Sequence, residues 1–362
     1  MQIIRDRRAL HRIPELDRSL PKTMAYLKNA LAPLRCTVFS PAESSLCAFF
    51  DFGRETAIAF RSDADALPIA ECSGVDFASE HPGQMHACGH DGHMAMVLEL
   101  ARRLNEKTEL PHNVLLVFQC AEETDGGAKD ICEAGVFETY RVEAIFGMHL
   151  WPGLPEGQIA SRETEMLARS CEIYVDIYGK SAHIARAAEG VDAMAAGVAF
   201  YQRMQAMEAA LPQEIFRLVK FGVFHSGTVN NALSAHTRLE GSIRAFQDEV
   251  YFSLREGAEQ IGRDLEREFG CTVAIRLTDG YPAVMNPTPL YQKVRALVPF
   301  AELSSPFMIA EDFSWYQRHL PGMFFFLGAG DVPPLHAANF NFNEEILEKG
   351  AAFYERLAEA FV

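Results

Sequence analysis

The first half of the chain alternates apolar runs with segments of helical periodicity. Residues 112–123 (HNVLLVFQCAEE) contain an apolar run that ends in two acids, and residues 143–152 (EAIFGMHLWP) contain one that carries His149 near its end. Such runs are typical of strands buried in a parallel sheet. Between them, residues 92–106 repeat apolar side chains at helical spacing, and Asp91 is expected to be the N-cap of that helix. Strands that alternate with helices predict an α/β sheet, which binds ligands beyond the carboxyl ends of its strands.

A different pattern begins near residue 170. Residues 171–178 (CEIYVDIY) alternate apolar and polar side chains, as a half-exposed strand does. Residues 249–270 form a strongly amphipathic segment, and Gly270 is expected to stop this helix. With a helix near 190–207 and further strands, the order becomes β-α-β-β-α-β, which predicts a split βαβ sandwich. An antiparallel sheet with one polar face suits an inserted domain that covers a site or pairs with a copy of itself.

The α/β pattern returns after residue 280, with an apolar strand at 322–330 and a closing helix at 343–361. The sequence therefore predicts a discontinuous domain, residues 1–168 and 281–362, interrupted by an inserted domain at 169–280. No internal repeat is visible. A chain of 362 residues is long enough for two such cores.

Charge and composition narrow the possible partners. The net charge of −16 argues against nucleic acid or anionic lipid as a ligand, because a phosphate backbone requires a basic surface. No apolar run approaches the roughly 20 residues needed to cross a bilayer, and the N-terminus lacks the pattern of a signal peptide. Eight cysteines occur singly rather than in a disulfide pattern, so we expect a cytoplasmic protein whose thiols are free to bind metal.

The stretch HACGHDGH, residues 86–93, concentrates potential metal ligands. Cys88 and His90 are two residues apart, so an extended backbone points both side chains to the same side. A thiolate with an imidazole suits zinc or another borderline divalent metal. For His86 and His93, hydrogen bonding behind the ligands or simple exposure explains the sequence at least as well.

Further candidates stand near other predicted strand ends. Glu122 and Glu123 follow an apolar run, and two desolvated carboxylates side by side repel each other unless a cation holds one of them. An acidic pair at a helix start, facing solvent, is the alternative interpretation. His149 lies near the end of the predicted strand at 143–152, and His336 lies in the loop after the predicted strand at 322–330. Because strand ends of an α/β domain meet at one edge, these side chains are expected to converge.

Several motifs together resemble the metallopeptidase superfamily of aminoacylase and carboxypeptidase G. The resemblance is closest to its amidohydrolase branch, which includes N-acetyl-amino-acid and N-acetyldiaminopimelate deacetylases and indoleacetyl-amino-acid hydrolases. It extends from LHRIPE near the N-terminus to the last helix. The motifs that carry it, in chain order, are RSDADALPIAE, HACGHDGH, FQCAEE, GMHLWP, GKSAH, GSIRAF, AEDFSWY and PLHAANF.

The resemblance implies a fold, a cofactor and roles for individual residues. The fold is a zinc-peptidase-like α/β domain with an inserted ferredoxin-like α+β lid that forms a homodimer. The cofactor is a pair of divalent ions, manganese or zinc, with cobalt and nickel also compatible. The implied roles assign Cys88, His90, Glu123, His149 and His336 as metal ligands, Glu122 as general base, His183 as a histidine given to the partner subunit's site, and Arg244 and Asn230 as substrate-binding residues.

Two stretches differ from related proteins. Where the wider superfamily has a His-x-Asp motif with a ligating histidine, this chain has Asp63-Ala64-Asp65, and we interpret both aspartates as supports for a ligating histidine. After His183, HIARAAEGVDA replaces the His-Ala-Ala-x-Pro-His run that is common in the branch. This difference is expected to alter the pocket for the acyl group.

The predicted activity is metal-dependent hydrolysis of the amide bond of an N-acyl amino acid, N-acetyl in the simplest case. A dipeptidase or carboxypeptidase of the same chemistry is the first alternative, because the metal ligands do not distinguish the two. A catalytically idle metal-binding protein is the second. Against it, Glu122 and His183 have no evident purpose once hydrolysis is lost.

Overall fold

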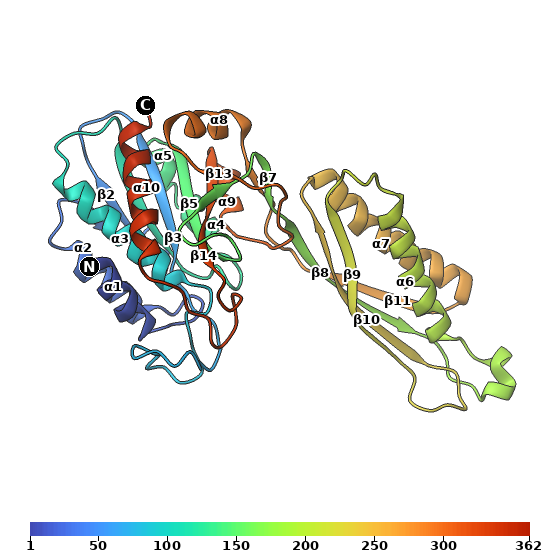
Figure 1. Cartoon of the computed structure of the whole chain (residues 1–362). Helices are drawn as coiled ribbons and strands as arrows, with labels where there is room; N and C mark the ends of the chain where they lie inside the picture. Colours follow the sequence, from blue (N-terminus) through green and yellow to red (C-terminus); the bar gives the residue numbers. More distant parts are fainter. The chain divides into compact units, whose positions relative to one another are not determined.

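The computed structural model describes residues 1–362 and divides them into two compact units. Unit 1 comprises Met1–Met166, Met285–Pro306 and Asp312–Val362, and unit 2 comprises Leu167–Val284 and Phe307–Glu311 (Figure 1). No helix is both long and apolar enough to span a membrane.

Unit 1 is built on an eight-stranded mixed sheet with the order β1-β2-β4-β3-β5-β14-β6-β13. Its four central strands, β4, β3, β5 and β14, run parallel to one another, so their carboxyl ends share one edge. The strands are β1 (Thr37–Phe39), β2 (Leu46–Phe50), β3 (Ala57–Asp63), β4 (Asn113–Gln119), β5 (Val142–Pro152), β6 (Ile159–Ser161), β13 (Ala301–Glu302) and β14 (Gly322–Gly330).

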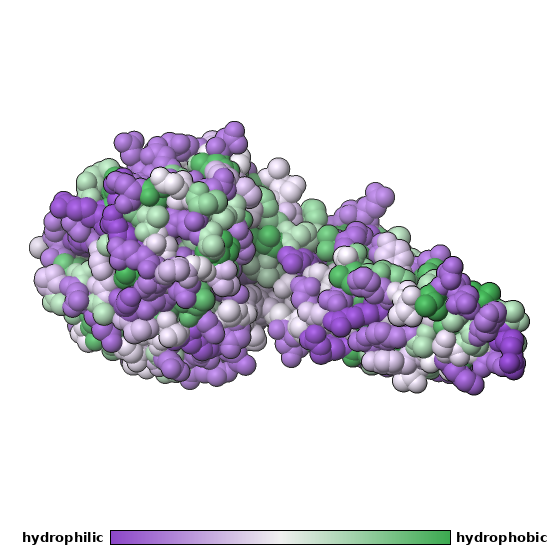
Figure 2. Space-filling view, turned by 90° about the horizontal axis from the view of Figure 1, so that it is seen from below, coloured by the Kyte–Doolittle hydropathy of each residue, from purple (hydrophilic) through white to green (hydrophobic).

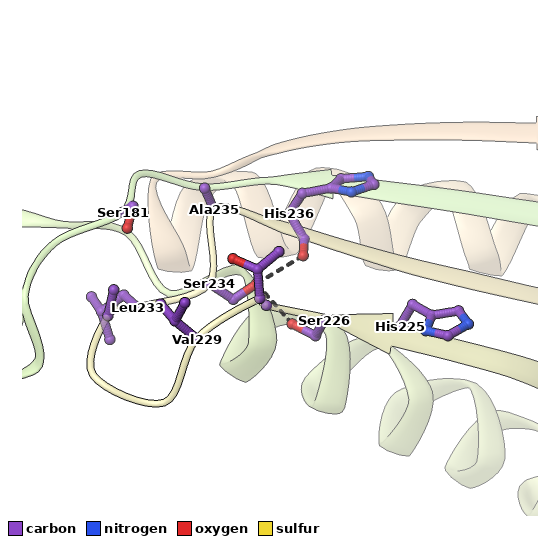
Figure 3. A pocket seen from close by; sticks show the side chains of 11 residues that line it. Ser181, His225, Ser226, Val229, Leu233, Ser234, Ala235 and His236 are labelled. Atoms are coloured by element: carbon purple, nitrogen blue, oxygen red, sulfur yellow. Dashed lines mark hydrogen bonds between the residues drawn. The ribbon is translucent and has the colours of Figure 1, made fainter.

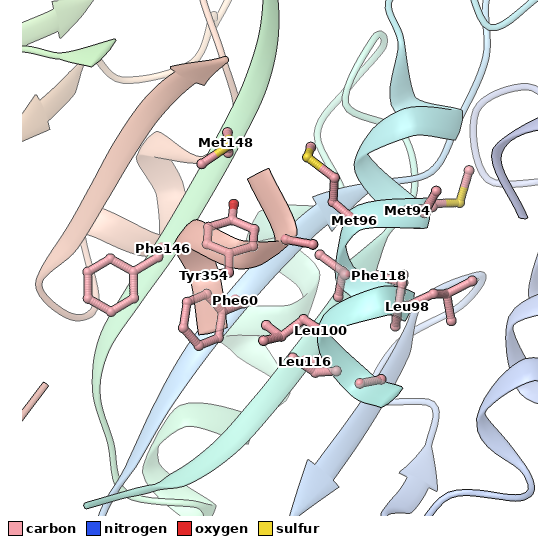
Figure 4. Close-up of a cluster of buried hydrophobic side chains, with 14 of the residues drawn as sticks. Phe60, Met94, Met96, Leu98, Leu100, Leu116, Phe118, Phe146, Met148 and Tyr354 are labelled. Atoms are coloured by element: carbon pink, nitrogen blue, oxygen red, sulfur yellow. The ribbon is translucent and has the colours of Figure 1, made fainter. Parts of the chain in front are cut away.

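Helices cover this sheet, and α3 packs against both α1 and α10 on one face (Figure 1). The core between them is rich in aromatic rings: Phe60 of β3 lies with its ring centroid 4.8 Å from that of Tyr354 of α10 (Figure 4). Such large rings contribute much of the apolar surface that folding buries. The helices of unit 1 are α1 (Gln2–His11), α2 (Pro21–Leu31), α3 (His90–Glu106), α4 (Ala128–Glu133), α5 (Val136–Thr139), α8 (Thr288–Leu297), α9 (Ser314–Gln317) and α10 (Ile346–Ala360).

The start of α3 corrects one prediction. Its N-cap is Gly89, in the left-handed conformation with φ of 86°, and Asp91 lies inside the first turn without capping it. A Cβ at position 89 would lie 2.8 Å from Leu150 Cδ1, so glycine is required both by conformation and by space. Asp91 instead pairs with Arg7 and His11 of α1, each at 2.8 Å. The helix therefore begins two residues earlier than its periodicity indicated.

Unit 2 has the predicted β-α-β-β-α-β order. Its antiparallel sheet has the order β11-β8-β10-β9, which leaves β9 at one edge, and Cys171, Ile173, Val175 and Ile177 of β8 are buried as their alternation indicated. Helix α7 ends at Gly270, whose φ is 69°. The elements are β8 (Arg169–Tyr178), the 3₁₀ helix η1 (Ile184–Glu189), α6 (Ala193–Ala210), β9 (Arg217–Ser226), β10 (His236–Ala245), α7 (Asp248–Phe269) and β11 (Thr272–Leu277). Two short strands, β7 (Thr164–Leu167) and β12 (Val284–Asn286), pair separately.

Candidate metal centre

The carboxyl edge of the unit 1 sheet gathers the predicted ligands. Cys88, Glu123 and His336 form one group whose ligand atoms all lie within 4.8 Å of one another, and His90 and His149 belong to a second group of this kind. Cys88 Sγ lies 3.4 Å from His149 Nε2 and so connects the two groups. The five residues come from the loop before α3, the start of α3, the segments after β4 and β14, and the end of β5. Their roles as ligands stay predictions.

Hydrogen bonds orient two of the imidazoles. His90 Nδ1 is 2.8 Å from the carbonyl oxygen of Asp65, and His149 Nδ1 is 2.7 Å from that of Leu150. A carbonyl only accepts, so each Nδ1 carries the proton and each Nε2 is unprotonated, as in metal-ligating histidines. Nε2 of His90 is buried and has no hydrogen-bond partner. A buried polar atom left in this state fits a site built for a cation.

The electrostatics of the cluster fit the same interpretation. Burial lowers the pKa of both His90 and His149, which keeps their rings in the neutral form that binds metal. Burial, together with Glu123 and Glu122, raises the pKa of the Cys88 thiol well above its usual value. A bound divalent cation would reverse that balance and favour the thiolate. The donor set of sulfur, imidazole and carboxylate therefore fits a pair of borderline divalent ions.

Glu123 and His336 form an ion pair in which His336 Nε2 lies 3.3 Å from Glu123 Oε1. Burial alone would raise the pKa of Glu123, but His336 and His90 bring it below its usual value. The same contact raises the pKa of His336, against the effect of burial. The backbone of His336 is held next to Cys88, because its N–H donates to the carbonyl oxygen of Ala87 at 2.9 Å. Position 336 takes a φ of 64°, which is uncommon for a residue other than glycine.

Asp65 binds the backbone of the two adjacent acids, Glu122 and Glu123. The backbone N–H groups of Glu122 and Glu123 donate to its two carboxylate oxygens, at 3.0 and 3.1 Å. Glu122 is buried, and its carboxylate lies within 4.8 Å of ligand atoms of His90 and Glu123. Asp65 thus supports His90 through its carbonyl and both glutamates through its carboxylate. The expectation that Asp65 supports a ligating histidine stays a prediction, which the contact of its backbone carbonyl with His90 favours.

His86 takes no part in either group. Its ring is buried, and neither nitrogen has a hydrogen-bond partner. Burial lowers the pKa of His86 to about 3, so the ring is neutral at physiological pH. Its ring centroid lies 6.5 Å from that of His11. The sequence analysis assigned no role to Arg61, Gln119 and Asp312, because the polarity of a single residue does not show that it is buried and paired.

The remaining predicted residues lie in unit 2. His183 is exposed and caps η1, its Nδ1 accepting the N–H of Ala185 at 3.1 Å. It forms an isolated bridge with Ala232 of the loop between β9 and β10, and this loop also carries the exposed Asn230. Arg244 of β10 donates to Ser242 Oγ at 3.3 Å and to the carbonyl oxygen of Met308. The roles of all three in substrate binding or catalysis stay predictions.

A pocket of about 310 Å³ lies beside the same loop. It is lined by small and polar side chains, among them Ser181, Ser226 and Ser234 (Figure 3). Ser234 donates to the carbonyl oxygen of His236 at 2.7 Å, and Ser226 donates to Ser234 at 2.8 Å. These bonds give the loop a defined shape next to His183.

Comparisons with known proteins agree with this geometry. A model of Peptidase family M20/M25/M40 matches residues 59–360. An uncharacterized hydrolase of Staphylococcus epidermidis is 35% identical over 97% of this chain and 96% of its own length. Among solved structures, a putative aminohydrolase from methicillin-resistant Staphylococcus aureus is 28% identical, has a TM-score of 0.92 and covers 98% of this chain and 95% of its own. A Bacillus subtilis protein described as a dinuclear metal binding peptidase from the M20 family is 29% identical, has a TM-score of 0.84 and covers 99% and 96%.

The fold and the site therefore define a metal-dependent hydrolase. The chain belongs to Peptidase family M20/M25/M40, and within it to the enzymes that hydrolyse amide bonds. The predicted fold class, a mixed α/β sheet flanked by helices, is confirmed.

Proposed function

We propose that the chain hydrolyses N-acyl amino acids, in the simplest case N-acetyl amino acids, to a carboxylate and a free amino acid. The observation that carries this proposal is the convergence of Cys88, His90, Glu123 and His149 beside one more acid, Glu122, at one edge of the sheet. His336 completes the set. Ligands for divalent ions beside a carboxylate that is not needed as a ligand are the groups that metal-assisted amide hydrolysis uses.

The ligands divide between two divalent ions. Cys88, Glu123 and His336 would hold one, His90 and His149 the other, and Cys88 is placed to contact both. When bound, such ions lower the pKa of water to about 7 and polarise a carbonyl oxygen, so that a nucleophile is available at neutral pH. Manganese and zinc fit this donor set, and cobalt or nickel would also bind.

Glu122 is the residue proposed to move protons. Its backbone is fixed by Asp65, so the carboxylate has a defined position beside the ligand atoms. We assign to it the removal of a proton from the attacking water and its delivery to the nitrogen of the leaving amine. One residue can do both because the two transfers follow each other at the same edge of the substrate.

Unit 2 is proposed to recognise the substrate. Arg244 would bind the free carboxylate of the amino-acid half, since a guanidinium pairs strongly with that group, and Asn230 would contact the substrate as well. His183 would stabilise the developing oxyanion in the partner subunit's site. His183 is exposed between β8 and η1, outside any core, and this exposure supports such a role.

A homodimer through unit 2 is part of this proposal. Strand β9 is an edge strand whose outer N–H and C=O groups are free to pair. Beside it, α6 exposes Met194, Val198 and Tyr201 at helical spacing, each more than 40% accessible, and Phe224 of β9 is exposed next to them. Figure 2 shows apolar patches among the polar residues that cover unit 2. An unpaired edge with an adjacent apolar stripe suits a second copy of the same surface.

We place the enzyme in the cytoplasm, in which the eight cysteines stay reduced; all eight are free in the structure. A dipeptidase is the second candidate function, favoured by the name of the family and by the peptidase among its relatives.

The test is a substrate panel. The purified chain, stripped of metal and reloaded with manganese, would be assayed with N-acetyl amino acids, with the same amino acids as dipeptides, and with N-acetyl amines that lack the carboxylate. The proposal expects the first set to be hydrolysed with the highest kcat/KM. Preference for dipeptides would establish the second candidate instead. Glu122→Gln is the matched inactive control, because it keeps the size of the side chain.

A further inference from the structure

His93 lies among the candidate ligands, but both of its ring nitrogens already make hydrogen bonds. It lies three residues after His90 on α3, its side chain is 1% exposed, and its ligand atom belongs to the same group as those of His90 and His149. Its Nδ1 is 2.7 Å from Asp63 Oδ1, and the backbone N–H of Leu150 donates to its Nε2 at 2.9 Å.

These two contacts determine the tautomer. A backbone N–H only donates, so Nε2 of His93 must accept with its lone pair, and the proton of the ring must be on Nδ1. Nδ1 therefore donates to the carboxylate of Asp63. No lone pair of His93 is left for a metal ion, although the ring is close enough to the site to be mistaken for a ligand.

Asp63 is in turn fixed from its other side. Arg61 Nη1 donates to Asp63 Oδ2 at 2.9 Å, Arg61 Nε to Gln119 Oε1 at 2.9 Å, and Arg61 Nη2 to Asp312 Oδ1 at 2.7 Å. Gln119 Nε2 completes the ring by donating to Asp312 Oδ2 at 2.6 Å. Arg61, Asp63 and Asp312 are each at most 2% exposed. Buried charges with all their hydrogen bonds made hold one geometry rigidly, because any displacement leaves a charge unpaired.

The far end of this chain of contacts is the peptide that joins His149 to Leu150. His93 holds the N–H of that peptide, and its ring lies edge-on to the ring of His149, with centroids 4.4 Å apart and planes at 65°. His149 is further oriented by its own bond to the Leu150 carbonyl oxygen. The backbone and the ring plane of His149 are therefore set by contacts that begin in β3.

We propose that Arg61, Asp63 and His93 form a buried positioning chain that presents His149 to the metal centre, with His93 as a positioning residue and not a ligand. The inference rests on the proposed function, since it assumes that His149 binds metal. It also assigns Asp63 a role in place of the ligating histidine of the wider superfamily: its carboxylate supports the site through His93 and does not bind metal itself.

The experiment measures cobalt binding to the full-length protein and needs no substrate. Metal-free wild-type, His93→Leu and His93→Gln would be titrated with Co²⁺ and followed by the absorption of the bound ion. Loss of a contact behind a ligand costs about 10–100-fold in metal affinity. His93→Leu is therefore expected to weaken one of the two cobalt sites by about that factor, while the site that contains Glu123 and His336 still fills.

His93→Gln separates positioning from ligation. The carboxamide supplies one donor and one acceptor, so it is expected to restore most of the lost affinity and to return the cobalt spectrum toward that of the wild type. A ligand role for His93 predicts instead that glutamine fails as completely as leucine, and that result would overturn the proposal. Wild-type affinity at both sites in His93→Leu would overturn it equally.

Two further variants serve as controls for the effect of His93→Leu on cobalt binding. His112→Leu removes another buried imidazole of unit 1, one bonded to Thr56 Oγ1 at 2.8 Å, and should leave both cobalt affinities unchanged. If His93→Leu does not fold, Asp63→Asn tests the same chain, because an amide cannot accept from both Arg61 and His93, and one cobalt site should again weaken. A wild-type protein that binds fewer than two cobalt ions would contradict the proposed function itself and not the positioning chain alone.

Discussion

Cys88 Sγ lies 3.4 Å from His149 Nε2, although 61 residues separate them in the chain. A sulfur and a nitrogen bound to one tetrahedral zinc ion, at their usual bond lengths, are about 3.6 Å apart. The two atoms therefore already have the spacing of ligands to a common ion. Since Cys88 also belongs to the group with Glu123 and His336, its sulfur would be shared between the two proposed ions.

Replacing Cys88 with alanine should accordingly disturb both ions at once. Removing a supporting residue costs about 10–100-fold in metal affinity, so removing a shared ligand should cost at least about 100-fold. Metal content after dialysis, measured by mass spectrometry, should fall from about two ions per chain to less than one. Cys47→Ala, at a buried cysteine of β2, is the matched control and should keep both ions. Full metal content in Cys88→Ala would exclude Cys88 from the ligands.

Glu122→Gln should separate proton transfer from metal binding. The loss of a general base lowers kcat by about 10²–10⁴-fold. The metal content should not change, because Glu123 and not Glu122 is the assigned ligand. Steady-state kinetics and metal analysis on the same preparation check both parts. Glu133→Gln, at an exposed glutamate, should be indistinguishable from the wild type. An active Glu122→Gln enzyme would mean that another residue is the base.

Thorough chelation should both inactivate and destabilise the protein. The proposed ligands come from four separate places in unit 1, so ions bound there would connect segments that are distant in sequence. A ligand that binds only the folded state stabilises it by about 2.7 kcal/mol when its concentration is 100 times Kd. We therefore expect a higher Tm with added Mn²⁺ than with EDTA, together with recovery of activity. A Tm that does not respond to metal would argue against a folded binding site.

The convergence of the proposed ligands could be predicted from the sequence, because each of them stands in a short motif next to an apolar run. What it could not show were contacts made across the whole chain. Arg61 and Asp312 are 251 residues apart and meet as a buried ion pair at 2.7 Å. A charged residue within a strand is expected to face solvent, since burying a charge is unfavourable unless it is paired. A single sequence does not show which residue forms the pair.

The prediction of where α3 begins was wrong for a related reason. Asp91 has the residue type of an N-cap, and the rule that favours aspartate there is local. Two nonlocal facts override it: the close approach of Leu150 to Gly89, and the pairing of Asp91 with α1. Likewise, the sequence left open whether His93 is exposed or hydrogen-bonded behind the ligands, and the structure shows that both of its ring nitrogens are bonded.

Glu71 gives a prediction about pH that does not involve the metal centre. Burial would raise its pKa, but hydrogen bonds from His11, Ser73 and the backbone of Ser79 lower it to about 2. A carboxyl group whose pKa is lower in the folded state stabilises that state above its unfolded pKa and loses this effect as the pH falls toward the folded value. The stabilising effect of Glu71 should therefore be complete above pH 4.5 and disappear near pH 2.

Glu71→Gln tests this directly. Urea unfolding at several pH values should show a difference in free energy of unfolding between wild type and variant, on the order of 2 kcal/mol at pH 6 after allowance for solvent screening. That difference should shrink steadily as the pH falls from 4.5 to about 2, because Glu71 is protonated in the unfolded state first and in the folded state only near pH 2. A difference that is constant with pH would mean that size or hydrogen bonding, and not the charge, is responsible.

The sharing of His183 between subunits can be tested by mixing two inactive variants. His183→Ala keeps Glu122, and Glu122→Gln keeps His183, so a mixed dimer contains one site with both residues intact. Random exchange between two equal pools makes half of the dimers mixed, and about a quarter of all sites should then be active. Activity should rise from near zero to about that fraction as the chains exchange, and the time course should follow subunit exchange measured with labelled chains. The matched control mixes His183→Ala with His183→Ala/Glu122→Gln, in which no site has both residues, and should stay inactive. If exchange occurs and the first mixture gains no activity, His183 acts within its own chain or not at all.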